Sequence, residues 1–228
     1  MDHQALWLTL KLAIATTAIL LAIALPLAWW IACGESILRS LVQALVALPL
    51  VLPPTVLGYY LLIAMGPLTF PGRMLMRIFG HPLAFSFMGL LLGSVLYSLP
   101  FAVQPLVAGF KAVDHGYLEA AAGLGISPWR VLVSVVLPLS RSSLITSAVL
   151  AFTHTIGEFG VVLMLGGNIP GATRTLSISL YDQVEEFNYA AANRTALLLL
   201  GFAVAALLAV YLLPITGRLG GRQADVVR

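Results

Sequence analysis

The sequence predicts an all-α polytopic membrane protein with about five transmembrane helices. Of its 228 residues, 60% are hydrophobic and only 9% are charged, whereas a soluble domain carries roughly a quarter charged residues. The apolar residues gather into runs of about 20, the length at which a helix crosses the hydrocarbon layer of a bilayer. So few charges cannot cover a water-soluble surface, and we expect the outer surface to face lipid. The length suits a single domain over residues 1–228.

The first predicted span covers residues 6–31 and has tryptophans at both ends. Trp7 stands at one end, and Trp29 and Trp30 stand at the other. At the helical rise these positions lie about 33 Å apart, which suits aromatic side chains at two membrane interfaces. The run is longer than the apolar core of a signal peptide and no basic residues precede it, so we expect a permanent span.

The second predicted span, residues 41–65, contains Pro49, Pro53 and Pro54. Proline removes a backbone donor and kinks a helix. One interpretation is a broken helix, of the kind that transporters place beside a cavity. The other is that the prolines only shape helix packing. The sequence leaves both interpretations open.

Three further spans are predicted, over residues 83–107, 142–165 and 191–213. Residues 66–82 are expected to form a loop with at most one interfacial turn, and residues 166–189 a long mixed loop. Five spans place the two termini on opposite sides of the membrane. If the C-terminal tail is cytoplasmic, seven of the 12 basic residues lie inside the cell. The positive-inside rule therefore favours, weakly, a cytoplasmic C-terminus and a periplasmic N-terminus.

The segment between the third and fourth spans, residues 111–140, carries the most specific pattern. Its key residues are Glu119, Ala120, Ala121, Gly125, Val135, Leu137 and Pro138. Their spacing resembles the EAA loop of ABC importer permeases, which reads E-A-A, three residues, G, nine residues, I-x-L-P, with Val135 here in place of isoleucine. The resemblance implies a type I importer permease fold, also called MetI-like. It also implies that the segment docks on an ATPase subunit as a cytoplasmic coupling loop.

The same segment predicts its own local shape. Residues 117–124 favour a helix with Glu119 in the first turn, where the helix dipole favours a negative charge. The alanines at 120–122 make a slim helix that can enter a groove on another protein. Gly125 permits a sharp turn, and Pro128 suits the first turn of a second short helix. An ordinary glycine-capped loop would share these features, so only the full pattern favours docking.

The chain has no nucleotide site of its own. A phosphate-binding loop needs a glycine followed by lysine and Ser or Thr, but neither Lys11 nor Lys111 follows a glycine. We therefore expect a transport subunit that is not itself an enzyme, with ATP hydrolysed on a separate subunit. No cofactor is indicated, and the four histidines stand at no metal-ligand spacing. A net charge of only +3, spread along the chain, gives no nucleic-acid footprint.

The cargo is indicated by resemblance alone. Residues 156–160, Ile-Gly-Glu-Phe-Gly, resemble a motif shared by molybdate, tungstate and sulfate permeases, while residues 168–175 and 48–54 resemble the molybdate branch. This implies a permease subunit of a bacterial inner-membrane importer for molybdate, with sulfate or tungstate as the alternative. The resemblance also implies a homodimer with the pathway on its two-fold axis. Two ATP-binding subunits would bind on the cytoplasmic side, and a periplasmic molybdate-binding protein would deliver the cargo.

Polar residues on the predicted outer loop form one candidate site: Asn168, Thr173, Arg174 and Thr175. Hydroxyl groups and an arginine suit a tetrahedral dianion. One hypothesis is therefore that this loop meets the oxyanion or its loaded receptor. The favoured alternative is a structural loop or gate hinge without anion contact.

Glu158 is the only acidic residue within a predicted span, and charges inside a membrane are functional candidates by default. Because a carboxylate repels a dianion, we expect a structural or gating role. His154 lies four residues earlier on the same helix face, where it could pair with Glu158. These two residues, with Pro49, Pro53 and Pro54, are the gate or pathway candidates. A secondary transporter or channel would spread ionisable residues over several spans, which makes it a distant alternative.

Overall fold

A computed structural model of the protein describes residues 2–221, with the backbone alone at residues 115, 122 and 213–221, and the regular elements in that range are all helical. Three helices are long and apolar enough to cross a membrane: α1 (His3–Ala32), α5 (Phe87–Lys111) and α12 (Tyr189–Gly221), the last through Leu212. Two bent helix pairs bring the number of candidate spans to as many as five: residues 37–51 with 54–65, and residues 128–139 with 141–157. The polytopic all-α prediction agrees with this architecture.

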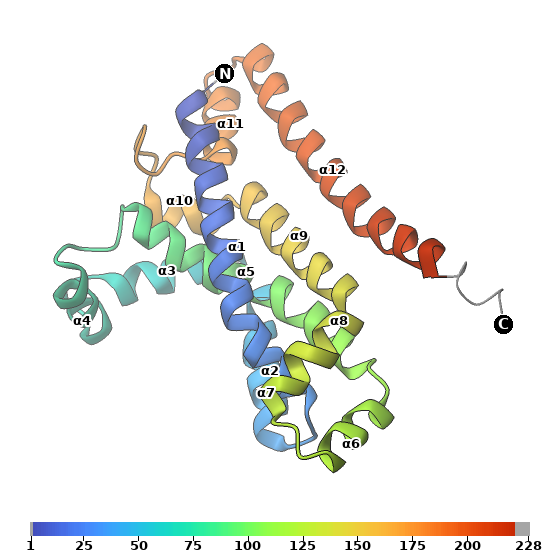
Figure 1. Ribbon diagram of the computed structural model, residues 1–228. Coiled ribbons are helices and arrows are strands. Elements are labelled where there is room, and N and C mark those ends of the chain that lie inside the picture. Colours follow the sequence, from blue (N-terminus) through green and yellow to red (C-terminus); the bar gives the residue numbers. More distant parts are fainter. Residues whose placement is uncertain (1, 222–228) are drawn as a thin grey trace.

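The N-terminal helix α1 runs the length of the molecule and packs along one side of the bundle (Figure 1). Asp2 caps it by accepting a hydrogen bond from the Ala5 N–H at 3.0 Å. One side of α1 is buried from end to end, and the fully buried Leu12 and Leu20 belong to that side. Because α1 packs against both α5 and α9 (Arg141–Gly157), it holds the two ends of the molecule together.

The second predicted span is a broken helix. α2 (Ile37–Val51) ends before the two prolines, α3 (Pro54–Met65) starts at the second one, and the two axes differ by 112°. The residue before a proline disfavours helical backbone, so Leu52, which is extended at φ −73° and ψ 135°, ends α2. Of the two interpretations left open by the sequence, the structure has the broken helix. Pro49 lies inside α2 without interrupting it.

The predicted span over residues 142–165 is not one helix, and this part of the prediction needs correction. α9 ends at Gly157, Glu158 is extended at φ −64° and ψ 131°, and α10 (Gly160–Gly166) starts two residues later. Glycines on both sides of the break weaken the helix there. The predicted third span also shifts, because Ser86 caps α5 by accepting from the Gly89 N–H at 3.2 Å and the helix starts at Phe87.

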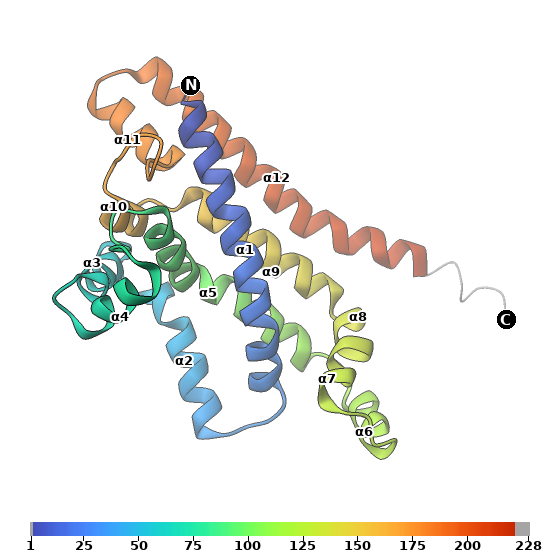
Figure 2. The ribbon, with the colours of Figure 1, turned by 60° about the vertical axis from the view of Figure 1, so that its left-hand side comes forward.

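Both predicted loops outside the spans contain a full helix. α4 (Phe70–Phe79) lies within residues 66–82, and α11 (Leu176–Glu185) lies within residues 166–189. α11 anchors the start of α12, because the Thr195 hydroxyl donates to Gln183 Oε1 at 2.9 Å. Figure 2 shows α12 running beside α9 toward the C-terminal end. Residues 222–228 of the predicted cytoplasmic tail lie outside the described residues.

The predicted coupling loop is a chain of short helices at the end of the molecule opposite the N-terminus (Figures 1 and 2). It consists of α6 (His115–Gly123), α7 (Pro128–Val131), a π-helical turn (Leu132–Val136) and α8 (Leu137–Leu139). α6 starts two residues earlier than predicted, where Asp114 Oδ1 accepts from the Gly116 N–H at 2.8 Å. Glu119 is therefore in the second turn of α6, not in the first.

Candidate functional site

The two interrupted helices meet, and close glycine contacts hold their breaks together. A Cβ added to Gly58 of α3 would lie 2.8 Å from Met164 Cβ and 3.3 Å from the Val161 Cα of α10. A Cβ added to Gly160 would lie 2.7 Å from Pro54 Cβ. Real Cβ atoms essentially never approach other atoms to 2.7 or 2.8 Å, so glycine at these two positions lets α3 lie directly on α10.

A cavity of about 480 Å³ opens where the breaks meet. It is lined by Pro54, Thr55, Tyr97, Thr153, His154, Gly157, Glu158, Phe159 and Gly160. The structure thus brings three of the predicted gate residues, from distant parts of the sequence, to one space. The other two, Pro49 and Pro53, are not in its lining. Pro53 instead caps α3.

Glu158 is buried at the break, with 4% of its surface exposed. The Ser94 hydroxyl of α5 donates to Glu158 Oε2 at 2.8 Å, and the Ser177 hydroxyl of α11 donates to the Glu158 carbonyl oxygen. The other carboxylate oxygen, Oε1, has no hydrogen-bond partner among the described residues. Glu158 therefore links the helix break to α5 and α11, and its second carboxylate oxygen is buried without a partner among the described residues.

His154 does not pair with Glu158, contrary to one of the sequence interpretations. Its Nδ1 lies 2.9 Å from the Ser98 hydroxyl, and its ring stacks on Phe101 with the centroids 3.9 Å apart. The reason is in α5, where Ser94 and Ser98 stand four residues apart. His154 in α9 and Glu158 at its end are also four residues apart, so Ser98 meets His154 and Ser94 meets Glu158.

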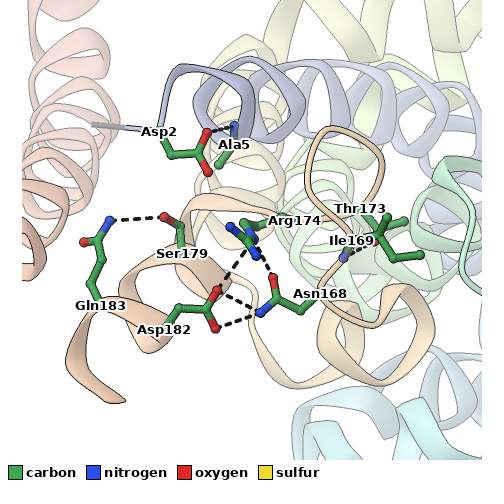
Figure 3. Close-up of polar contacts among 9 residues, drawn as sticks. All are labelled: Asp2, Ala5, Asn168, Ile169, Thr173, Arg174, Ser179, Asp182 and Gln183. Atoms are coloured by element: carbon green, nitrogen blue, oxygen red, sulfur yellow. Dashed lines mark hydrogen bonds and ion pairs between the residues drawn. The ribbon is translucent and has the colours of Figure 1, made fainter. Parts of the chain in front are cut away.

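The outer-loop candidates form an internal network (Figure 3). Arg174 Nε donates to Asn168 Oδ1 at 2.6 Å and lies 3.6 Å from Asp182 Oδ2. The Asn168 amide donates to both Asp182 carboxylate oxygens, at 2.7 and 2.8 Å. Because Asp182 of α11 neutralises Arg174, this loop presents little free positive charge to an anion.

The two threonines of the loop are also engaged. Thr173 is fully buried, and its hydroxyl donates to the Gly166 carbonyl at 2.6 Å. The Thr175 hydroxyl lies 2.9 Å from that of Ser177, next to the bond that reaches Glu158. The following N–H, of Leu176, donates to Thr9 Oγ1 of α1 at 2.9 Å. The loop is thereby tied to both the helix break and the N-terminal helix.

The lever formed by residues 115–139 attaches to the bundle through buried residues and ends in an exposed tip. Ala121 is 4% exposed, whereas Glu119 and Ala120 lie on the exposed side of α6. Gly125 has a φ of +67°, a backbone conformation that favours glycine, and it makes the predicted turn. At the base, the π-helical turn leads into Leu137 and Pro138, and the Ser140 hydroxyl donates to the Gly109 carbonyl of α5 at 3.2 Å.

Several polar partners at these sites were not identified from the sequence: Ser94, Ser98, Ser177 and Asp182. Ser94 and Ser98 carried a usable signal, since two serines four apart in an apolar span are spaced to serve one helix face. Asp182 gave no such signal, because its role depends on the folded loop. Within the part of the chain that the structure describes, no group of three or more His, Cys, Asp or Glu residues could hold a metal ion.

Comparisons with known proteins give a family, similar permeases and a shared fold. A model of the family described as "Binding-protein-dependent transport system inner membrane component" matches residues 24–217. The molybdenum transport system permease protein ModB of Azotobacter vinelandii is 49% identical over 210 residues, covering 92% of this chain and 93% of that protein. The protein of that name from Escherichia coli K12 is 35% identical over 184 residues, covering 81% and 80%. The permease fold is shared with a chain of the inward-facing MetNI methionine ABC transporter, at a TM-score of 0.71 and 18% identity, over 92% and 93% of the two chains.

Proposed function

The chain belongs to the family of binding-protein-dependent transport system inner membrane components, and we propose that it is the membrane subunit of an ABC importer that carries molybdate. The observation that carries the proposal is 49% identity, over almost the whole chain, to a permease named for molybdenum transport. Residues 156–160 resemble a motif shared with sulfate and tungstate permeases, so those oxyanions are the alternative cargo.

Reconstitution tests both the cargo and the energy source. The purified chain is placed in liposomes with its ATPase subunit, and its binding protein is loaded with labelled molybdate. We expect uptake that requires ATP and all three components, and that excess sulfate does not suppress. Preferred transport of sulfate would refute the cargo. Uptake without the ATPase would refute the importer mechanism and favour a secondary transporter.

Energy reaches the chain, in this proposal, through the lever of residues 115–139. Its exposed tip offers Glu119 and Ala120, with Leu124 at 78% and Trp129 at 62% exposure, as the docking surface for an ATP-binding subunit. The buried base transmits movement to α5 and α9, because Ser140 joins the two helices at that point. The sequence has no glycine-lysine phosphate-binding motif, which supports hydrolysis on a separate subunit.

The cavity between the helix breaks is proposed as part of the gate. Broken helices beside a cavity are how transporters admit irregular backbone at membrane depth. Here Pro54, His154 and Glu158 share that space, and Glu158 also bonds to α5 and α11. Movement of any of these helices would change the cavity. Glu158 acts in this proposal as a positioning residue, because it is buried and its hydrogen bonds go to Ser94 and Ser177.

The outer loop fits the hinge interpretation better than the oxyanion interpretation. Arg174 is held by Asn168 and Asp182, and the loop bonds to Thr9 and Glu158. We propose that docking of the periplasmic binding protein on this side moves α11 and, through Ser177, the helix break. Free anion would then bind no more weakly to an Arg174→Gln variant than to the parent, which equilibrium dialysis with labelled molybdate measures.

The assembly is proposed as a homodimer with a periplasmic N-terminus and a cytoplasmic lever. So few spans cannot enclose a pathway comfortably, and a two-fold dimer would place it between two copies. The N-terminus and α6 lie at opposite ends of the molecule, as this topology requires (Figure 1). A Leu124→Cys variant in a Cys33→Ser background tests it. Labelling from the cytoplasmic side alone is expected, and labelling from the periplasm would invert the arrangement.

A further inference from the structure

Helix α4 exposes two parallel rows of side chains of different character. One row is apolar: Phe70, Met74 and Ile78, at spacings of four residues, are 75%, 56% and 64% exposed. The adjacent row consists of Arg73 and Arg77, which are exposed and again four residues apart. Residues four apart share a helix face, so α4 presents an apolar strip with a basic strip beside it.

The rest of α4 is fixed to the bundle, so these rows have one orientation. The Thr69 hydroxyl donates to the Ala64 carbonyl at 2.9 Å and accepts from the Gly72 N–H at 3.2 Å. A Cβ on Gly72 would run into the Gly66 carbonyl, so the helix start lies directly on the end of α3. Leu75 packs on the core from the same side. The exposed rows therefore point away from the bundle, at whose edge α4 stands (Figure 1).

Among the residues that the structure describes, no acidic side chain forms an ion pair with Arg73 or Arg77. Residues 36–113 contain no aspartate or glutamate. Among the described residues, the one ion pair is that of Arg174 with Asp182. Two guanidinium groups beside exposed phenylalanine, methionine and isoleucine thus form a surface that suits a partner with both an anionic group and an apolar part.

We infer that α4 is a binding site for an anionic phospholipid. A short helix with an apolar face and a basic edge lies in the interfacial plane of a bilayer, with the apolar side chains at the level of the upper acyl carbons. The planar guanidinium groups match phosphate oxygens, and the arginine stems reach the headgroups from an apolar position. α4 lies between α3, which is the second half of a bent candidate span, and α5, which is a candidate span, and this location places the helix near the membrane surface. The inference holds for either leaflet and does not depend on the cargo.

Quenching of a fluorophore on α4 by brominated lipid tests this site. Bimane is attached to a Met74→Cys variant in a Cys33→Ser background, in nanodiscs that contain brominated phosphatidylglycerol or brominated phosphatidylcholine at equal fractions. We expect stronger quenching by the anionic lipid. The Arg73→Gln/Arg77→Gln double variant is expected to lose that preference, by roughly fivefold for each arginine at low ionic strength. An Arg194→Gln variant, at another exposed arginine, is the matched control and should keep it.

Three outcomes would overturn the inference. Equal quenching by both lipids in the parent would mean lipid contact without a headgroup site. Absence of quenching by either lipid would mean that water, a second copy of the chain or a binding protein covers the face. The same effect in the double variant and in the Arg194→Gln control, whether no loss or an equal loss of the preference, would assign the charge effect to the whole protein and not to α4. Size-exclusion profiles identical to the parent establish that each variant is folded.

Discussion

Gly58 provides the sharpest test of the proposed gate, because a single methyl group is enough to separate α3 from α10. In the Gly58→Ala variant the new Cβ would lie 2.8 Å from Met164 Cβ, 3.1 Å from Met164 Cγ and 3.3 Å from the Val161 Cα. The last of these is a backbone atom that cannot rotate away. Overpacking of this kind costs about 1–3 kcal/mol. Against this, alanine in a helix gains up to about 1 kcal/mol over glycine.

Gly201 is the matched control, since it lies inside α12 and a Cβ there would meet nothing within 4 Å. The propensity gain is shared by both substitutions and cancels in the comparison. Gly58→Ala should therefore be about 1–3 kcal/mol less stable than Gly201→Ala. For a chain of this size that is a difference in melting temperature of roughly 2–12 °C.

The intrinsic fluorescence of the four tryptophans reports this difference in melting temperature in detergent. ATP-driven uptake by Gly58→Ala should fall as well. Equal melting temperatures and equal uptake for the two variants would refute the direct packing of α3 on α10.

Three other variants test the remaining contacts. A Glu158→Gln variant keeps an acceptor for the Ser94 hydroxyl and should transport like the parent. A Glu158→Ala variant should lose about 1–3 kcal/mol in its free energy of unfolding, and most of its uptake. An inactive Glu158→Gln variant would indicate instead that the gate needs a charge at this position. An Asp182→Ala variant leaves the Asn168 amide without its two acceptors, so a stability loss of about 1–3 kcal/mol is expected in thermal unfolding. An unaltered unfolding midpoint would show that the loop network does not stabilise the fold. In a Gly125→Ala variant the new Cβ meets no atom within 4 Å, and the only cost is that of a positive φ, about 1–2 kcal/mol. The variant should therefore fold, while transport-coupled ATP hydrolysis declines. Full coupling would show that the turn tolerates other backbone conformations.

The sequence predicted the class of fold because membrane spans are encoded locally. α1 needs only its own apolar run and the cap at Asp2 to form, and both can be read without knowledge of the rest of the chain. Gly125 and Pro128 likewise predicted a turn and a helix start that the structure contains, because a positive φ and a first-turn proline depend on one residue each. The helix break at Pro53 was likewise one of the two interpretations that the sequence offered, because a proline disfavours helical backbone in the residue before it.

Hydropathy does not locate the break at Glu158, because the apolar run at residues 161–165 continues the predicted span beyond it. The local signal was the pair of glycines, Gly157 and Gly160. The sequence predicts loops where α4 and α11 lie, because each helix is only ten residues long and is flanked by glycine, proline or polar residues. Such short helices gain most of their stability from packing. Gly72 against Gly66 and Ser177 against Glu158 are contacts of that kind, and they exist only in the folded chain.

The sequence alone determined that the chain is a polytopic membrane protein. It also carries a pattern that resembles an importer's coupling loop and predicts which residues form it, because composition and fixed spacing are properties of the linear chain. Tertiary structure alone decided that Pro54, His154 and Glu158 share one cavity, that His154 meets Ser98 rather than Glu158, and that Asp182 neutralises Arg174. These are contacts between segments far apart along the chain or across a folded loop. Their distances depend on how glycine-mediated packing aligns whole helices, and no local pattern in the sequence specifies that alignment.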